Sequence, residues 1–157
     1  MNPLAREVVQ RMTEKGLTLG TAESTVGGMI GHLITDVPGS SKVFVGGITA
    51  YHGRPKQMLL NVPAETLRDA GSVSKEATVA MARGGRAALQ VDLCVAESGI
   101  AGPSGNPERP SGLYWIAVSG ADGDRTERHV FQGDREATKL AAAEAALRLV
   151  LAAVEGR

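Results

Sequence analysis

Aromatic residues, cysteine and excess charge are all scarce in this 157-residue sequence. Aromatics make up 3% of the residues, which is too few for a platform on which nucleic-acid bases stack. Seventeen Lys and Arg balance 17 Asp and Glu, so no excess of cations favours nucleic acid or anionic lipid. The one cysteine, Cys94, excludes an internal disulfide and a multi-cysteine metal site. We therefore expect a protein of the reducing cytoplasm that binds neither nucleic acid nor a membrane.

The sequence signatures of several common ligand sites are also missing. No apolar run approaches the roughly 20 residues that a membrane-spanning helix needs, and the charged first 11 residues are unlike a signal peptide. Neither G-x-G-x-x-G nor G-x-x-x-x-G-K-[ST] occurs, which argues against a dinucleotide cofactor and a P-loop. No H-E-x-x-H, paired histidine or cysteine pair offers zinc ligands. We expect neither a metal nor an organic cofactor.

Helix and strand patterns alternate along most of the chain. Capping residues precede helical patterns at 3–15, 75–89 and from 135 onwards, and shorter helical patterns occur at 27–34 and 63–67. In the last helix we expect one apolar face made of Leu140, Leu147, Leu151 and Val154.

Strands are expected at 17–22, 43–51, 92–96, 112–119 and 126–131. The last two flank a Gly- and Asp-rich turn at 120–124 that is typical of an antiparallel hairpin. We predict a single α/β domain over residues 1–157, a three-layer α/β/α sandwich with a mixed, mainly parallel sheet.

Ser24 stands between the strand at 17–22 and the helix at 27–34. A serine there can expose its hydroxyl beside helix N-terminal amides that stabilise an oxyanion, or it can simply cap the helix, which is the commoner role. A nucleophile also needs a base. His52 lies near a strand end but gives little support for a Ser-His-Asp triad. Lys56 can serve if burial lowers its pKa, although a lysine is more commonly a solvated surface charge.

Two segments have the composition of anion-binding sites. Small residues at 99–105 let a phosphate or carboxylate approach the backbone N–H groups, and they equally suit a plain turn. Asp134 and Arg135 open the last helix, where amides and a guanidinium can hold a phosphate or form an ordinary capped start. Ser72 and Lys75 complete an S-x-x-K motif, which we set aside because Ser74 is explained as a helix cap.

Considered together, these segments resemble one known family, the competence/damage-inducible CinA C-terminal domain family. The likeness covers nearly the whole chain, in the family's order and with near-family spacing. The matching segments are Thr21-Ala22-Glu23-Ser24 with Gly27 and Gly28, Tyr51 with Lys56, Gly71-Ser72-Val73-Ser74, SGIAGP at 98–103, and Gly133-Asp134-Arg135.

The resemblance implies a serine–lysine amidase. Family members include bacterial nicotinamide-nucleotide amidohydrolases, which convert nicotinamide mononucleotide to nicotinate mononucleotide and ammonia. Ser24 matches the nucleophile, Lys56 the base, and Tyr51 the hydroxyl that helps to relay the proton. Ser98 and Arg135 match positions that line the substrate pocket. By the same resemblance we expect a small-molecule nucleotide substrate and, as in family members generally, a homo-oligomer.

Two further assignments concern the backbone of the glycine-rich segments. We expect the amides of Gly27 and Gly28 to be the oxyanion donors. For the substrate phosphate we expect the backbone from Gly102 to Gly105, together with Arg135.

Val26 departs from the family pattern, because members commonly carry threonine at this position. If that hydroxyl binds the carboxamide or the oxyanion, its loss costs about 1–3 kcal/mol of transition-state stabilisation. The competing hypothesis for the whole chain is a non-catalytic ligand-binding or regulatory domain that keeps the pocket.

Overall fold

A five-stranded mixed sheet forms the centre of the computed structural model, which describes residues 1–156. Its strand order is β2-β1-β3-β4-β5. The strands are β1 (Leu19–Glu23), β2 (Phe44–Thr49), β3 (Leu93–Gly99), β4 (Leu113–Gly120) and β5 (Gly123–Val130). β1 pairs in parallel with β2 and β3, whereas β4 runs antiparallel to both of its neighbours. The carboxyl ends of β1, β2 and β3 therefore lie at one edge of the sheet, where α/β proteins usually bind ligands.

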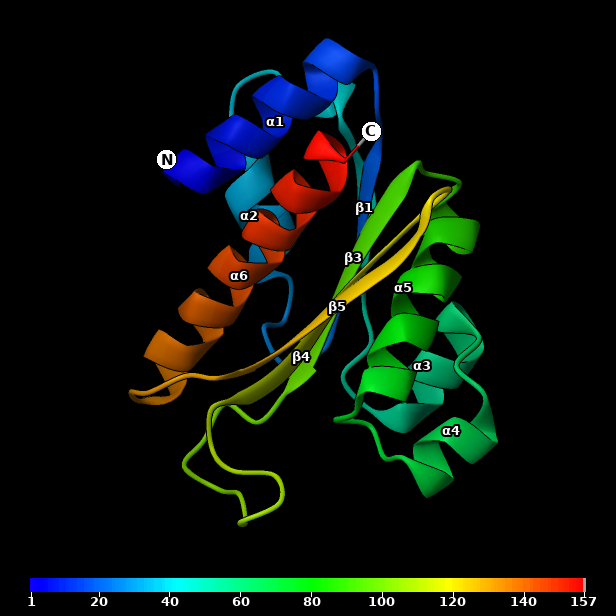
Figure 1. The fold of residues 1–157 in the computed structure, drawn as a ribbon, viewed down its shortest axis with the longest axis vertical. Coiled ribbons are helices and arrows are strands. Elements are labelled where there is room, and N and C mark those ends of the chain that lie inside the picture. Colours follow the sequence, from blue (N-terminus) through cyan, green and yellow to red (C-terminus); the bar gives the residue numbers. More distant parts are fainter. Residues whose placement is uncertain (157) are drawn as a thin grey trace.

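Helices cover both faces of this sheet (Figure 1). On one face lie α1 (Pro3–Lys15), α2 (Met29–Thr35) and α6 (Arg135–Glu155), and on the other lie α3 (Gly53–Leu60), α4 (Ala64–Asp69) and α5 (Lys75–Leu89). A short 3₁₀ helix, Ser40–Lys42, precedes β2. A cluster of buried apolar side chains fills the space between the sheet and each helical layer. The expected three-layer α/β/α sandwich with a mixed sheet is confirmed.

Side-chain caps begin three helices at the expected residues. Asn2 accepts hydrogen bonds from two backbone N–H groups of α1, Ser74 accepts one from α5, and Asp134 accepts one from α6. Each cap satisfies N–H groups that have no partner within the helix. Gly16 then ends α1 in a left-handed conformation, with φ of 65°, which glycine adopts without strain.

The structure corrects two details of the expected elements. α3 was not expected, because Gly53 and Pro55 read as turn residues. Both lie in its first turn, however, where the missing proline N–H has no helical partner to lose. The β4–β5 hairpin is tighter than expected, because Gly120 pairs with Gly123 and only two residues form the turn.

The expected apolar face of α6 extends too far toward its N-terminus. Leu147, Leu151 and Val154 are buried against the sheet and α1, but Leu140 is 44% exposed. The first turns of α6 lie near the ligand edge of the sheet (Figure 1), and the residue buried there is Thr138. The periodicity was right for the helix, but only the packing shows where its buried stretch begins.

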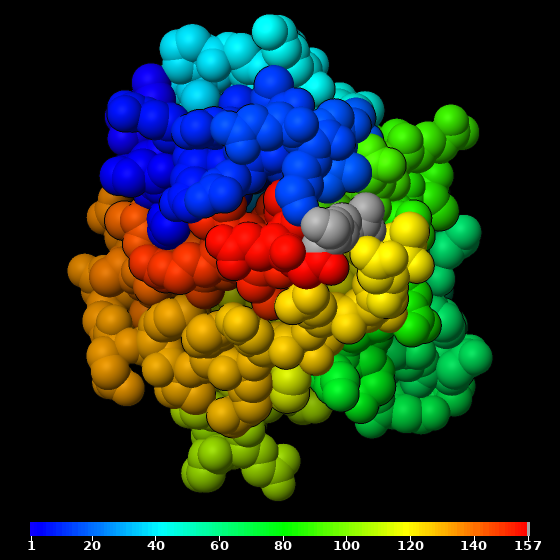
Figure 2. Space-filling view, turned by 45° about the horizontal axis from the view of Figure 1, so that its top comes forward, coloured from blue at the N-terminus to red at the C-terminus, as the bar shows by residue number. Residues whose placement is uncertain are grey.

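The loop between β3 and β4 projects from the body of the protein (Figure 2). Backbone hydrogen bonds from Ile100 to Leu113 and from Gly112 to Ile100 close its base. Arg109 donates a 2.7 Å hydrogen bond to the carbonyl oxygen of Ala70, which tethers the far part of the loop to the end of α4. Within residues 1–156, no helix is both long and apolar enough to cross a membrane.

Candidate active site

Three neighbouring strand ends meet at the candidate site. Ser24 follows β1, Ala50 and Tyr51 follow β2, and Ser98 is the second-to-last residue of β3. The Ala50 N–H donates to the carbonyl oxygen of Glu23 at 2.8 Å, which holds the chain after β2 beside Ser24. Because side chains alternate between the faces of a strand, Ser24 points to the face opposite that of Glu23. That is the face covered by α3 and α5.

Lys56 and Ser24 form a buried pair, although they are 32 positions apart in the sequence. Lys56 projects from α3, is 1% exposed, and its Nζ lies 2.8 Å from Ser24 Oγ. The Nζ group also donates to the carbonyl oxygens of Ala50 at 3.0 Å and Tyr51 at 3.1 Å. A neutral amine has two hydrogens and one lone pair, so two carbonyls and one serine hydroxyl match its requirements.

Burial also favours the neutral form of this lysine. Loss of solvation lowers the pKa of Lys56, and the negative charge of Glu97 opposes the shift. A lysine with a lowered pKa can accept the proton of a neighbouring serine hydroxyl. The structure therefore places the expected nucleophile, Ser24, in contact with the expected base, Lys56.

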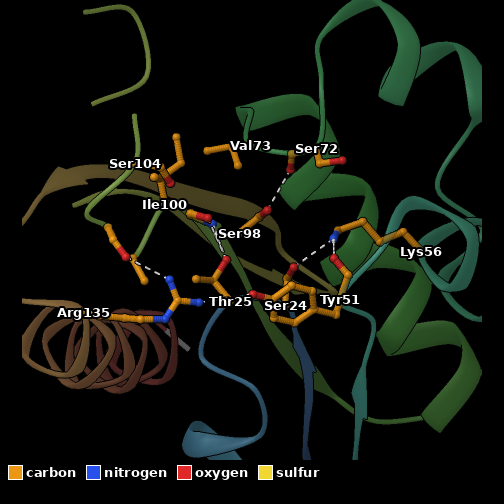
Figure 3. Close-up of a pocket in the computed structure, with 13 residues that line it drawn as sticks. Ser24, Thr25, Tyr51, Lys56, Ser72, Val73, Ser98, Ile100, Ser104 and Arg135 are labelled. Carbon is orange, nitrogen blue, oxygen red and sulfur yellow. Dashed lines mark hydrogen bonds between the residues drawn. The ribbon is translucent and has the colours of Figure 1, made fainter. Parts of the chain in front are cut away.

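The pair opens onto a cavity of about 240 Å³, and Arg135 lies on the opposite side (Figure 3). Arg135 donates to the carbonyl oxygen of Gly102 at 2.9 Å and to the hydroxyl of Tyr51 at 3.3 Å. Ser98 also lines the cavity, and its hydroxyl donates to the carbonyl oxygen of Ser72 at 2.8 Å. A concave site with a guanidinium on one wall suits a small anionic molecule.

Tyr51 lines the cavity and contacts Lys56 and Arg135 through different atoms. Its carbonyl oxygen accepts from Lys56, whereas its hydroxyl accepts from Arg135. Its hydrogen bond to Arg135 joins two walls of the cavity. The expected proton relay by the Tyr51 hydroxyl stays a prediction.

Three glycines expected in the site do not line the cavity. Gly27 donates its N–H to the carbonyl oxygen of Ser24 at 3.1 Å, so this amide is already used within the turn. Gly28 is the N-cap of α2. Gly105 lies against the later part of its own loop, where a Cβ atom at position 105 would come within 2.5 Å of Ser111 N. The oxyanion and phosphate contacts expected from these three residues stay predictions that the cavity lining does not support.

Val26 also lies outside the cavity. Its side chain is buried in the apolar cluster that contains Ile30 and Ile34. The side chain at this position points into the core, and the effect of the substitution on activity stays a prediction.

Thr25 is a lining residue that the sequence analysis missed. Its hydroxyl donates to Gly99 O at 2.7 Å and accepts from Gly99 N at 3.1 Å, which ties the turn after Ser24 to the end of β3. Within residues 1–156, the Thr25 N–H has no hydrogen-bond partner. It is therefore an available amide next to Ser24. Ser72 and Val73 also line the cavity, and the only sequence signal for them was the G-S-V-S segment.

Glu97 was missed as well, although an acidic residue in an otherwise apolar strand is a detectable signal. Its Oε1 accepts from the N–H groups of Ser24 at 2.6 Å and Val26 at 3.0 Å. Burial raises the pKa of Glu97 to about 7, against the effect of these two hydrogen bonds. Within the described part of the chain, no group of three or more His, Cys, Asp or Glu residues is arranged to hold a metal ion.

A family model described as the CinA C-terminal domain matches residues 1–154. The chain belongs to this family. A CinA-like protein of Parasynechococcus marenigrum (strain WH8102) is 49% identical over 133 residues, which cover 84% of this chain and 32% of that protein. A CinA-like protein of Geotalea uraniireducens (strain Rf4) is 43% identical over 134 residues, or 85% of this chain and 32% of that protein. The chain thus spans about a third of the length of these curated relatives.

Crystal structures of CinA superfamily proteins share the fold over nearly the whole chain. One from Klebsiella pneumoniae superposes with a TM-score of 0.94 at 28% identity, covering 98% of this chain and 97% of that one. The competence/damage inducible protein CihA from Agrobacterium tumefaciens gives a TM-score of 0.89 at 35% identity, with 95% and 92% covered. The resemblance inferred from the sequence motifs is confirmed.

Proposed function

We propose that this CinA-family chain is an amidohydrolase that converts nicotinamide mononucleotide to nicotinate mononucleotide and ammonia. The observation that carries the proposal is the 2.8 Å contact between buried Lys56 Nζ and Ser24 Oγ at the mouth of a cavity. A paired nucleophile and base are the minimum equipment for acyl transfer. The specific amide follows from the family resemblance.

In the first half of the reaction, Ser24 Oγ attacks the carboxamide carbon while neutral Lys56 accepts the hydroxyl proton. The two carbonyls that accept from Nζ hold the amine in place and also stabilise the ammonium that forms. Lys56 then donates this proton to the departing nitrogen, which leaves as ammonia. The product is an ester between Ser24 and the nicotinate carboxyl.

In the second half, water attacks the ester carbon while Lys56 again accepts a proton. The proton returns to Ser24 Oγ as the acid leaves, and the resting pair is restored. Both tetrahedral intermediates carry a negative oxygen next to Ser24. We assign its stabilisation to the N–H of Thr25, in place of Gly27 and Gly28, because the Thr25 amide is unpartnered and its residue lines the cavity.

Arg135 is the proposed contact for the substrate phosphate. It stands across the cavity from Lys56 and is partly exposed, so it can turn toward an anion at modest cost (Figure 3). In the structure it donates to the carbonyl oxygen of Gly102, a contact that an anionic ligand can replace. Because the Gly102 carbonyl is an acceptor, we assign phosphate binding to the guanidinium.

The deciding experiment measures ammonia release from nicotinamide mononucleotide by the purified protein. Ser24→Ala and Lys56→Ala should each abolish release, while the exposed-residue controls Ser41→Ala and Lys42→Ala should leave it unchanged. Calorimetric titration of the same ligand into Ser24→Ala reports binding separately from turnover. Binding to the unmodified protein without ammonia release would contradict the proposal and favour the non-catalytic binding domain.

Three expectations from the sequence stay predictions beside this proposal: a nucleotide as substrate, a homo-oligomer, and a cytoplasmic location. The first is tested by the ammonia assay. The second is tested by the mass of the protein in sedimentation equilibrium, where a monomer over the working concentration range would contradict it.

A further inference from the structure

Glu97 is a buried carboxylate to which the proposed reaction assigns no step. It lies in β3, is fully buried, and belongs to the face of the sheet that α2 and α6 cover. Its Oε1 accepts from the backbone N–H groups of both Ser24 and Val26, the residues on either side of Thr25. One oxygen atom therefore holds the chain before and after the peptide that carries the unpartnered Thr25 N–H.

Packing alone does not explain an acidic residue at this position. Burying a carboxylate costs several kcal/mol that an apolar side chain of similar size would avoid. The turn after Ser24 also has internal hydrogen bonds of its own, from Gly27 N to Ser24 O and from Met29 N to Val26 O. Within residues 1–156, moreover, Glu97 Oε2 is buried without a hydrogen-bond partner.

Glu23 offers a close comparison on the neighbouring strand. It is also buried, lies on the same face of the sheet, and accepts two backbone N–H groups. Its two oxygens are used separately, one by Ile30 and one by Gly31, both in the first turn of α2. Glu23 is thus an ordinary helix-stabilising acceptor, whereas Glu97 is bound to the nucleophile turn.

We propose that Glu97 is a positioning residue that fixes the turn from Ser24 to Val26. By taking the N–H groups on both sides, it leaves the Thr25 N–H for the oxyanion and holds Ser24 Oγ against Lys56. It acts through the backbone and does not touch the substrate. The inference rests on the proposed function, because it takes Ser24 as the nucleophile.

Glu97 also faces other ionisable groups, so its charge affects the pH profile of the reaction. The groups that interact with it are Glu23 on β1, Lys56 on α3 and Tyr114 on β4. The charge of Glu97 raises the pKa of Lys56 against the effect of burial. A neutral residue at position 97 should therefore lower the pH at which Lys56 becomes a free base. This shift reports the charge of Glu97, whereas the changes in kcat and KM report how it positions the turn.

The test compares Glu97→Leu and Glu97→Gln with Glu23→Leu and Glu23→Gln as matched controls. Glu97→Leu removes the acceptor, so kcat should fall by about 100-fold with KM within about threefold. Glu97→Gln keeps an acceptor oxygen, so kcat should recover to within about tenfold of the parent, with the acid limb of the kcat profile moved to lower pH. Both Glu23 variants should lose stability but keep kcat within about threefold and leave the acid limb in place.

A kcat for folded Glu97→Leu within threefold of the parent overturns the inference. If that variant does not fold, Glu97→Gln decides by itself, and a kcat more than about tenfold below the parent overturns the inference.

A second readout separates this inference from the choice of substrate. The rate of Ser24 labelling by a fluorophosphonate probe depends on serine activation and oxyanion binding, and Ser24→Ala provides the blank. If the parent protein is labelled but releases no ammonia, the proposed substrate fails, and the labelling rates of the four variants still decide the role of Glu97. If the parent is neither labelled nor active, the proposed function and this inference fall together.

Discussion

Replacing Lys56 by methionine tests the central pair most directly, because the two side chains are similar in length and methionine has no basic nitrogen. The change removes three hydrogen bonds of 2.8 to 3.1 Å, to Ser24, Ala50 and Tyr51. A positioned general base contributes about 10² to 10⁴ in rate. We expect kcat to fall by at least about 10³, which corresponds to about 4 kcal/mol of transition-state stabilisation.

The stability of Lys56→Met should change much less than its activity. Three lost hydrogen bonds cost about 1 kcal/mol each. The cost of burying an amine, several kcal/mol for the charged form, is avoided at the same time. We therefore expect a free energy of unfolding within about 2 kcal/mol of the parent, or a Tm shift of no more than about 8 °C.

The assay pairs ammonia release with differential scanning calorimetry on Lys56→Met, Ser24→Ala and the double variant. Because Ser24 and Lys56 act as one unit, the kcat of the double variant should be no lower than that of the less active single variant. A folded Lys56→Met protein with kcat within tenfold of the parent would refute the role of Lys56 as base. Strictly additive losses in the double variant would show that the two residues act independently.

Three further predictions concern pH, packing and the tyrosine. The kcat should rise with pH through the pKa of Lys56. Because burial lowers this pKa, the rise should be centred below the ordinary lysine value of 10.5. A rise centred at or above that value would argue against a buried base. Gly84→Ala should reduce the free energy of unfolding, measured by urea titration, by about 1–3 kcal/mol, because the new Cβ would collide with the backbone of Leu60 in α3. Unchanged stability would show that α3 and α5 can separate freely. Tyr51→Phe should raise KM and keep kcat within about tenfold, because the hydroxyl contacts Arg135; a loss in kcat of about 10³ would instead support a proton relay.

Much of the architecture could be predicted because its signals are local. Capping by Asn2, Ser74 and Asp134 depends on residues within a few positions, and all three caps are present. The alternation of helices and strands likewise led to the α/β/α sandwich. α3 was missed because Gly53 and Pro55 are turn residues by composition, and only their position in a first turn makes them compatible with a helix.

The candidate site was predictable in part, through motifs and not through geometry. The family resemblance pointed to Ser24, Lys56, Ser98 and Arg135, all of which line the cavity. It did not point to Glu97, whose proposed positioning role depends on hydrogen bonds from two backbone N–H groups more than 70 positions away in the chain.

The sequence by itself determined every helix and strand of the sandwich except α3, and the chemical character of the residues at their ends, because capping, periodicity and turn composition act over a few residues. Tertiary structure alone decided the chemistry of the site. The parallel pairing of β1 with β2 brings α3 beside Ser24, and the packing of α3 under α5 removes water from Lys56. A lysine becomes a base, and one amide among several becomes available for an oxyanion, only when long-range packing sets their solvation and their partners.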